Sequence, residues 1–418
     1  MLLAKLLDHL IRVGTLVLID ADGASHRFSG TDPGPEVTVR LHDKRLYRRL
    51  FYGPELRAGE AYMDGTLTVE DGSIFDFLNL VARNYEAAQG YHPVADKARR
   101  LDTLFRHIQQ FNPARFSRRN VAHHYDLSGE LYELFLDQDR QYSCAYFPTG
   151  EEDLETAQDL KKRHIAAKLQ LEPGQSVLDI GSGWGGMGLY LARTFGVKVT
   201  GVTLSEEQLK VSRARAAAEG LDDRVRFELV DYRALGGRYD RIVSVGMFEH
   251  VGVGHFRDYF GQVRDLLTDD GVALLHTIGR MEPPGSTSPW IRKYIFPGGY
   301  IPALSETVAA IERSTLWVTD VEILRMHYAH TLSRWRDRFQ ENRDKVKALY
   351  DETFCRMWEF YLAASEVSFR NMGNTVFQIQ IARRQDAVPL TRDYIGQVER
   401  DLAGDSAAPR AVRESQSA

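Results

Sequence analysis

Cysteine is nearly absent from the chain. Only Cys144 and Cys355 occur among the 418 residues, and they lie far apart in the sequence. This excludes a disulfide framework and a zinc ribbon, and it is typical of a protein of the reducing cytosol. The chain also lacks an apolar run long enough to span a bilayer. Lys5, Asp8 and His9 interrupt the apolar stretch at its start and no small-residue cleavage site follows, so we expect no signal peptide.

An excess of positive charge is also absent. The formal net charge is -5 at pH 7, which argues against a general nucleic-acid-binding protein. Hydrophobic residues make up 43% of the chain and aromatic residues 11%, as in packed globular proteins, and the length allows more than one domain. We expect no resident metal, and any contact with lipid would have to be peripheral.

The N-terminal part of the chain predicts a small α+β domain over residues 1–95. Its first residues place leucines and Ile11 on one helical face, which either packs on this domain or lies on a membrane surface. Short alternating runs follow at 15–19, 37–41 and 66–69 between Asp-Gly turns. Ser73 is placed to cap the helix that comes next.

Two segments predict no packed structure of their own. Residues 96–120 form a basic linker in which Phe105, Phe111 and Phe116 alternate with cationic residues. Such a stretch either contacts anionic lipid headgroups or is a solvated connection between domains. Residues 403–418 are small and polar and predict a disordered tail. The larger domain is therefore expected over residues 121–390.

Strands and helices alternate in the centre of that domain. The alternation predicts a parallel sheet with helices on both faces and a ligand at the carboxyl ends of the strands. The expected strands are Ser176–Ile180, Val197–Leu204, Val225–Asp231, Tyr239–Val245 and Gly271–Ile278, and the expected helices are Gly186–Thr194, Glu206–Glu219 and Phe256–Leu267.

The first strand of this series ends in a glycine-rich turn, Asp179-Ile180-Gly181-Ser182-Gly183-Trp184-Gly185-Gly186. Glycines permit left-handed backbone and close approach to a ligand, although the strict dinucleotide spacing is missing. After the second strand, Thr203 and Leu204 stand where a dehydrogenase carries an acid for the ribose, which disfavours a nicotinamide cofactor. After the third strand, Asp231 and Tyr232 could hold an adenine amine and the face of its ring.

A carboxylate follows the fourth strand, in Gly246-Met247-Phe248-Glu249-His250-Val251-Gly252. Glu249 either caps a helix start or has a function at the ligand edge of the sheet, and the flanking glycines favour the second interpretation. Later in the chain, residues 280–302 are rich in glycine and proline and carry Trp290 and Tyr294. A connection of this length is unusual in a compact domain and predicts a functional lid.

Several motifs, in a fixed order, carry a resemblance to one family. They are Asn120–Asp126, Gln141–Phe147, the glycine turn, Gly201–Ser205, Gly246–Gly252, Leu275–Ile278, Phe296–Pro302 and His327–Leu332. In these motifs the sequence resembles the cyclopropane-fatty-acyl-phospholipid synthases and the related mycolic acid cyclopropane synthases over about residues 115–385. The segment before them looks like the lipid-handling domain of the phospholipid-acting members.

This resemblance implies a Rossmann-like class I methyltransferase with helical insertions that uses S-adenosylmethionine. The implied cofactor-binding residues are Tyr142, Ser143, Gly181, Gly183, Thr203, Leu204, Gln208, Asp231 and Tyr232. It also implies a bound bicarbonate ion, held by Cys144, Glu249, His276, the backbone at Ile278, and Tyr328. The implied setting is a cytoplasmic homodimer that visits the inner face of the membrane.

The implied reaction transfers a methylene unit to a cis double bond of a phospholipid acyl chain. An alkene is a poor nucleophile, so a methyl sulfonium has to be held in line with it. The resulting carbocation requires a dry site, aromatic faces and a base that removes a methyl proton. Three alternatives stay open: a C-methyltransferase that closes no ring, a small-molecule N-methyltransferase, and a lipid-binding protein with an inactive domain.

Overall fold

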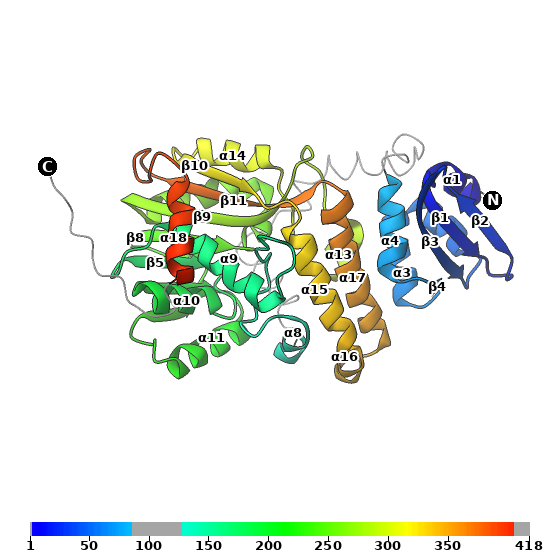
Figure 1. Ribbon diagram of the computed structural model, residues 1–418, viewed down its shortest axis with the longest axis horizontal. Coiled ribbons are helices and arrows are strands. Elements are labelled where there is room, and N and C mark those ends of the chain that lie inside the picture. Colours follow the sequence, from blue (N-terminus) through cyan, green and yellow to red (C-terminus); the bar gives the residue numbers. More distant parts are fainter. Residues whose placement is uncertain (1, 86–127, 405–418) are drawn as a thin grey trace.

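The computed structural model describes residues 2–85 and 128–404 of the chain. They form a four-stranded sheet near the N-terminus and a seven-stranded sheet, separated by a layer of helices (Figure 1). The predicted linker 96–120, the motif Asn120–Asp126 and residues 405–418 of the predicted tail lie outside the described residues.

The smaller sheet has the strand order β2-β1-β3-β4, with β1 and β3 parallel. Its strands are β1 (Val13–Ile19), β2 (Ser25–Ser29), β3 (Asp32–Leu41) and β4 (Leu67–Asp71). The sequence did not predict β2, because Phe28 is the one apolar residue among Ser25–Ser29 and gives no apolar alternation. Helices of this part are α1 (Leu2–Leu10), α2 (Leu46–Tyr52), α3 (Pro54–Met63) and α4 (Ile74–Arg83).

The apolar face of α1 packs on its own domain. Leu3 is buried in the core of the smaller sheet, and Leu6, Leu7 and Leu10 pack against that core. The Ser73 cap is present as well: its hydroxyl accepts a hydrogen bond from the Asp76 amide, and the Asp76 carboxylate accepts one from the Ser73 amide. This reciprocal pair satisfies two amides that the first turn of α4 would leave without partners.

The larger sheet has the strand order β10-β11-β9-β8-β5-β6-β7. Its strands are β5 (Ser176–Ile180), β6 (Lys198–Thr203), β7 (Val225–Leu229), β8 (Tyr239–Val245), β9 (Leu267–Arg280), β10 (Trp317–Ile323) and β11 (Asn374–Ala382). Neighbouring strands from β7 to β9 run parallel, whereas β11 is antiparallel to both β9 and β10. All five predicted strands are confirmed: β5 and β8 have the predicted bounds, β6 and β7 are shorter, and β9 is longer and begins at Leu267.

Helices cover both faces of this sheet. One face packs against α9 (Leu154–Leu169), α10 (Gly186–Phe195) and α11 (Glu206–Ala218), and the other against α12 (Phe256–Leu266) and α14 (Leu304–Glu312). The last helix, α18 (Asp393–Gly404), lies along α9 on the outside (Figure 1). The predicted alternation of strands and helices on two faces is therefore confirmed.

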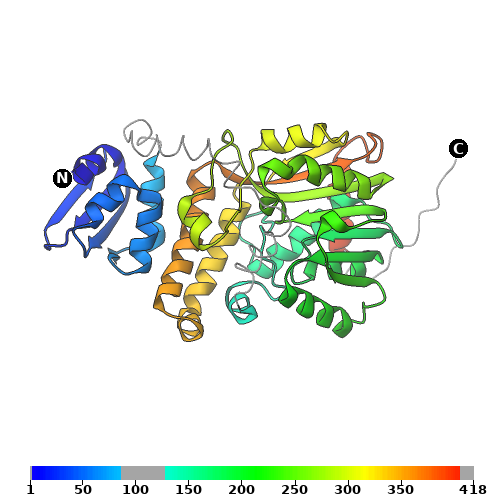
Figure 2. The same cartoon turned by 180° about the vertical axis from the view of Figure 1, so that it is seen from behind.

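A helical layer stands between the two sheets (Figure 2). It consists of α8 (Gly129–Phe135), α15 (His327–Glu341), α16 (Arg343–Leu349) and α17 (Glu352–Asn371). Helices α3 and α4 pack against α17. The Tyr62 hydroxyl donates to Glu359 at 3.0 Å across this contact, so the small domain is docked by polar as well as apolar groups.

The predicted lid is partly a docking element. Its helix α13 (Pro289–Tyr294) packs against α3. Lys293 and Tyr294 both donate to Glu60, and Trp290 is buried beside Gly59. Gly59 is required by this close approach, because a Cβ atom there would lie 2.3 Å from the indole nitrogen of Trp290.

Replacement of Gly59 by alanine is expected to loosen this docking. The added methyl group would overpack the contact with Trp290 and cost about 1–3 kcal/mol of folding free energy. The midpoint of thermal unfolding, followed by circular dichroism, should fall by several degrees. The matched control is Gly261→Ala in α12, where a Cβ atom meets nothing within 4 Å. That change should leave the midpoint unchanged or raise it, and equal midpoints for both variants would contradict the packing argument.

Candidate active site

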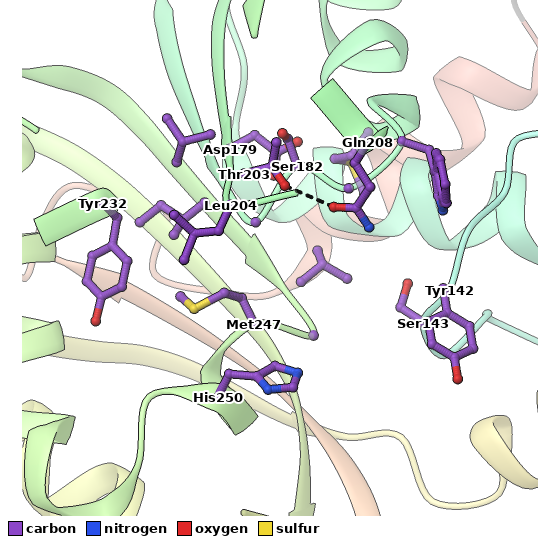
Figure 3. Close-up of a pocket in the computed structure, with 18 of the residues that line it drawn as sticks. Tyr142, Ser143, Asp179, Ser182, Thr203, Leu204, Gln208, Tyr232, Met247 and His250 are labelled. Atoms are coloured by element: carbon purple, nitrogen blue, oxygen red, sulfur yellow. Dashed lines mark hydrogen bonds between the residues drawn. The ribbon is translucent and has the colours of Figure 1, made fainter. Parts of the chain in front are cut away.

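A pocket opens at the carboxyl ends of β5, β6, β7 and β8 (Figure 3). The chain closes it from the other side with residues 140–143, which lead into α9. The nine residues predicted to bind the cofactor all line this pocket: Tyr142, Ser143, Gly181, Gly183, Thr203, Leu204, Gln208, Asp231 and Tyr232. Residues from four separate loops are thus brought together around one pocket.

The glycine turn after β5 follows from its backbone geometry. Gly181, Gly183 and Gly185 all have positive φ, at 84°, 53° and 87°. The amides of Gly181 and Ser182 donate to the Val202 carbonyl at 2.9 Å, which ties the turn to β6. Other residues would be strained at these φ values, and a Cβ atom at Gly181 would lie 2.8 Å from that of Met247, so glycine is required in this turn.

Two of the predicted contacts already have partners within the chain. The Thr203 hydroxyl donates to the Gln208 side-chain oxygen at 2.9 Å (Figure 3). This leaves the amide nitrogen of Gln208 for a ligand. The Asp231 carboxylate accepts hydrogen bonds from the Arg233 guanidinium, so this acid is held at the rim by a neighbouring cation.

The structure adds pocket residues that the sequence prediction omitted. Asp179 and Ser182 line the pocket, and each has a buried side-chain oxygen without a hydrogen-bond partner in the described part of the chain. Burial raises the pKa of Asp179 to about 7. Met247 and His250 also face the pocket (Figure 3), and burial lowers the pKa of His250 to about 4. The position of Asp179 at the carboxyl end of the first strand was the available signal.

The five residues predicted to hold an anion lie beside the pocket rather than in its lining. Glu249 is in direct contact with Ile278, whose amide donates to its Oε1 atom at 2.7 Å. The other carboxylate oxygen is buried and has no partner among the residues described. Burial raises the pKa of Glu249 to about 7. This carboxylate therefore has one buried oxygen that accepts no hydrogen bond of normal geometry from the described residues, with the Thr277 side chain close to the same carboxylate.

Cys144 and Tyr328 are buried in the same apolar cluster. Burial raises the pKa of the Cys144 thiol, which keeps it protonated and makes it a poor nucleophile. Tyr328 packs edge-on against Trp335 and lies against Phe369. His276 sits in β9, and burial, reinforced by the charges of Lys161 and Lys168, holds its pKa well below the ordinary range.

Two buried lysines of α9 complete this region, and neither was predicted. Lys161 and Lys168 are fully buried on one face of the helix. The Lys161 ammonium donates to Gln141 and, at 2.9 Å, to the Ser143 hydroxyl. It forms no ion pair within residues 2–85 and 128–404, and burial lowers its pKa to about 8. Its hydrogen-bond partners are neutral, but the nearby charges of Asp137 and Asp139 favour its ammonium form. A bound anion would add to this compensation.

Aromatic rings enclose the same end of the pocket. Tyr142 stacks on Trp335 with ring centroids 5.2 Å apart, and its hydroxyl lies 2.7 Å from that of Tyr361. Other aromatic side chains have different partners: Tyr146 lies between His164 and His327, and Tyr294 and Tyr300 donate to glutamates. Of these tyrosines, Tyr142 is the one that lines the pocket, together with the rings of Trp184 and Tyr232.

The described residues contain neither a membrane-spanning helix nor a cluster of metal-binding side chains. None of the helices there is long and apolar enough to cross a membrane. Within the described ranges, histidine, cysteine, aspartate and glutamate side chains form no group of three or more that could hold a metal ion.

Comparison with known proteins adds direct matches. A family model described as mycolic acid cyclopropane synthetase matches residues 113–379. The probable fatty acid methyltransferase of Pseudomonas putida is 38% identical, over 83% of this chain and 87% of its own length. The cyclopropane-fatty-acyl-phospholipid synthase of Escherichia coli is 37% identical, over 82% of this chain and 87% of its own.

A solved structure matches as well. Mycolic acid cyclopropane synthase CmaA1, complexed with SAH and CTAB, aligns with a TM-score of 0.61 and 33% identity, covering 65% of this chain and 99% of its own. The fold and the resemblance predicted from the sequence motifs are both confirmed. The chain belongs to the mycolic acid cyclopropane synthetase family of S-adenosylmethionine-dependent methyltransferases.

Proposed function

We propose that this enzyme transfers a methylene unit from S-adenosylmethionine to a cis double bond in the acyl chain of an unsaturated phospholipid, giving a cyclopropane fatty acid. The observation that carries the proposal is the position of Glu249. Its unpartnered buried oxygen lies beside a methyl-donor pocket and next to the Ile278 amide. The name of the Escherichia coli relative supports the substrate class.

The pocket residues account for binding of the methyl donor. Gly181 and Gly183 allow the donor to lie close to the backbone. Asp179 has a buried carboxylate oxygen that accepts no hydrogen bond from the described residues and is available to the donor. Gln208 presents an amide nitrogen to polar groups of the ligand, and Tyr232 an aromatic face to its adenine. Together these residues would hold the sulfonium in one orientation, which in-line transfer requires.

The residues beside the pocket fit a bicarbonate ion. Glu249 would accept a hydrogen bond from its hydroxyl group, His276 and Tyr328 would orient it, and Cys144 would pack against it. When bound, bicarbonate would supply the base for loss of a proton from the transferred methyl group. The Ile278 amide donates to Glu249 and thereby keeps the carboxylate in place. Lys161 adds a buried positive charge that favours an anion over a neutral ligand.

The surrounding aromatic cluster suits a cationic intermediate. Tyr142, Trp335 and Tyr361 come from different elements and pack in one apolar cluster next to the pocket, which Tyr142 lines. The faces of such rings stabilise positive charge without reacting with it. We assign the acyl chain to this cluster between α8, α15 and α17.

The rest of the proposal concerns the setting of the enzyme. Residues 1–95 would handle the lipid, and residues 121–390 would carry out catalysis. We propose a cytoplasmic homodimer that reaches the inner face of the membrane transiently.

A second function is favoured by one comparison. The Pseudomonas putida relative is named a probable fatty acid methyltransferase. The same pocket would then transfer a methyl group to the same double bond, and the product would be a methyl-branched or methylene chain without a ring. Such a product requires a different fate for the carbocation, while the residues that bind the donor stay the same.

Product analysis separates the two functions. Purified enzyme is incubated with S-adenosylmethionine, bicarbonate and vesicles of a monounsaturated phospholipid, and the fatty acid methyl esters are analysed by mass spectrometry and proton NMR. A gain of one CH₂ with upfield cyclopropane protons is the expected result. A branched or exocyclic-methylene signature would replace the proposal by the second function. Absence of any mass gain would return the question to soluble amines or to a non-catalytic role.

Glu249→Gln should preserve binding of S-adenosylmethionine but lower turnover by about 10²-fold or more, since the buried acceptor becomes an amide. Calorimetry measures the binding and product formation the turnover. The matched control is Glu312→Gln on the exposed side of α14, which should match the wild type. Unchanged turnover in Glu249→Gln would remove this residue from the reaction.

The activity is also expected to depend on the ionisation of Glu249. Its pKa lies at about 7, so the protonated carboxyl predominates below that pH and its acceptor is lost. We expect kcat/KM to rise with pH and level off above about 7, measured at a fixed bicarbonate concentration. This rise should disappear in Glu249→Gln. Its persistence would assign the ionisation to Asp179, whose pKa is also raised to about 7.

A further inference from the structure

His276 has a specific neighbour on the adjoining strand. It pairs directly with Gln378 across the antiparallel β9–β11 ladder, so both side chains lie on the same face of the sheet. The Gln378 side-chain nitrogen lies 3.2 Å from the Nδ1 atom of His276. Both residues are buried, with exposed fractions of 0% for Gln378 and 2% for His276. Because both side chains are buried, neither has bulk water as an alternative hydrogen-bond partner.

Lys168 determines which way the Gln378 amide points. Its ammonium lies 2.8 Å from the Gln378 side-chain oxygen and is fully buried. An ammonium has donors only, so it has to face the oxygen of the amide and not its nitrogen. The amide nitrogen is then left to face His276, and a flipped amide would place two donors against each other.

Lys168 is in turn held by an ion pair. Its ammonium donates to Glu322 on β10, which favours the charged form of the lysine. Glu322 also lies 2.7 Å from one ring nitrogen of His164, and the other nitrogen lies 2.6 Å from Glu399 on α18. The chain of contacts therefore runs from the last helix to His276, and each member has a fixed position.

The proton on His276 follows from this orientation. The Gln378 amide nitrogen can only donate, so Nδ1 of His276 has to accept and carries no proton. Because burial keeps the ring neutral, its one N–H is then at Nε2, on the opposite edge. We infer that Lys168 and Gln378 are positioning residues that fix His276 as the Nε2–H tautomer. The catalytic role of this tautomer rests on the proposed function, because an anion bound beside Glu249 requires an N–H donor from His276.

The tautomer can be measured directly in the whole protein. Ring-¹⁵N-histidine is incorporated, and long-range proton–nitrogen correlations distinguish protonated from unprotonated ring nitrogens. The His276 signals are those that disappear in His276→Gln. We expect a protonated Nε2 and an unprotonated Nδ1 in the wild type. A proton on Nδ1 would overturn the inference, and this result needs neither methyl donor nor lipid.

Gln378→Glu should invert the arrangement with little change in shape. One carboxylate oxygen would accept from Lys168, and the other would face Nδ1 and require a proton there. We expect Nδ1 to become protonated and turnover to fall by about tenfold or more, with unchanged S-adenosylmethionine affinity. An inverted tautomer with full turnover would show that the orientation of His276 is not used.

A control and a second variant keep the result interpretable. Gln380→Glu introduces the same carboxylate two positions along β11, where the side chain contacts Tyr394 and the Lys168 carbonyl. It should leave the His276 tautomer unchanged. If Gln378→Glu does not fold, Lys168→Met removes the donor that orients the amide, and His276 should show both tautomers. A single Nε2–H form in that variant would contradict the role of Lys168.

The outcomes also separate this inference from the proposed function. An Nε2–H tautomer in an enzyme that forms no cyclopropane or methylated lipid would leave the positioning pair intact and reject the reaction. An Nδ1–H tautomer in an enzyme that forms the cyclopropane product would reject the positioning role of Lys168 and Gln378 and leave the proposed reaction intact.

Discussion

The free-energy cost of burying charged side chains away from water is the constraint on which this active site depends. Asp179, Glu249, Lys161 and Lys168 are all buried at or near one edge of the sheet. Charged groups in such a place are unstable unless partners or ligands compensate them. Lys168 has Glu322, but the free oxygens of Asp179 and Glu249 have no partner among the described residues. The site is therefore built for ligands that complete these interactions.

Much of the fold was accessible from the sequence because its signals are local. The parallel strands of the larger sheet are short apolar runs, and one of the helices between them, α11, begins at a side-chain cap, Ser205. The nine residues predicted to bind the cofactor all line the pocket, since parallel strands end at one edge and the glycine turn marks it. The strand β2 escaped prediction because Phe28 is its one apolar residue.

The missing parts of the site depend on contacts between distant segments. From the sequence alone, Lys161 and Lys168 look like exposed residues of a helix. They are buried because α9 packs against β9 and contacts β11 through Lys168. The role of Gln378 depends on its register with His276, which no local pattern specifies. Trp290 belongs to a segment that looks like a free loop, yet its partner Gly59 lies in the other domain. Long-range pairing of this kind leaves no periodic signal.

The contact of α13 with α3 has a consequence for how this family can vary. CmaA1 aligns over 99% of its own length but only 65% of this chain. In the present chain, Trp290, Phe360 and Tyr62 form one packed group across the domain boundary. The N-terminal domain is therefore no detachable module. A chimaera that exchanged it between relatives would also have to exchange α13 and the outward side of α17.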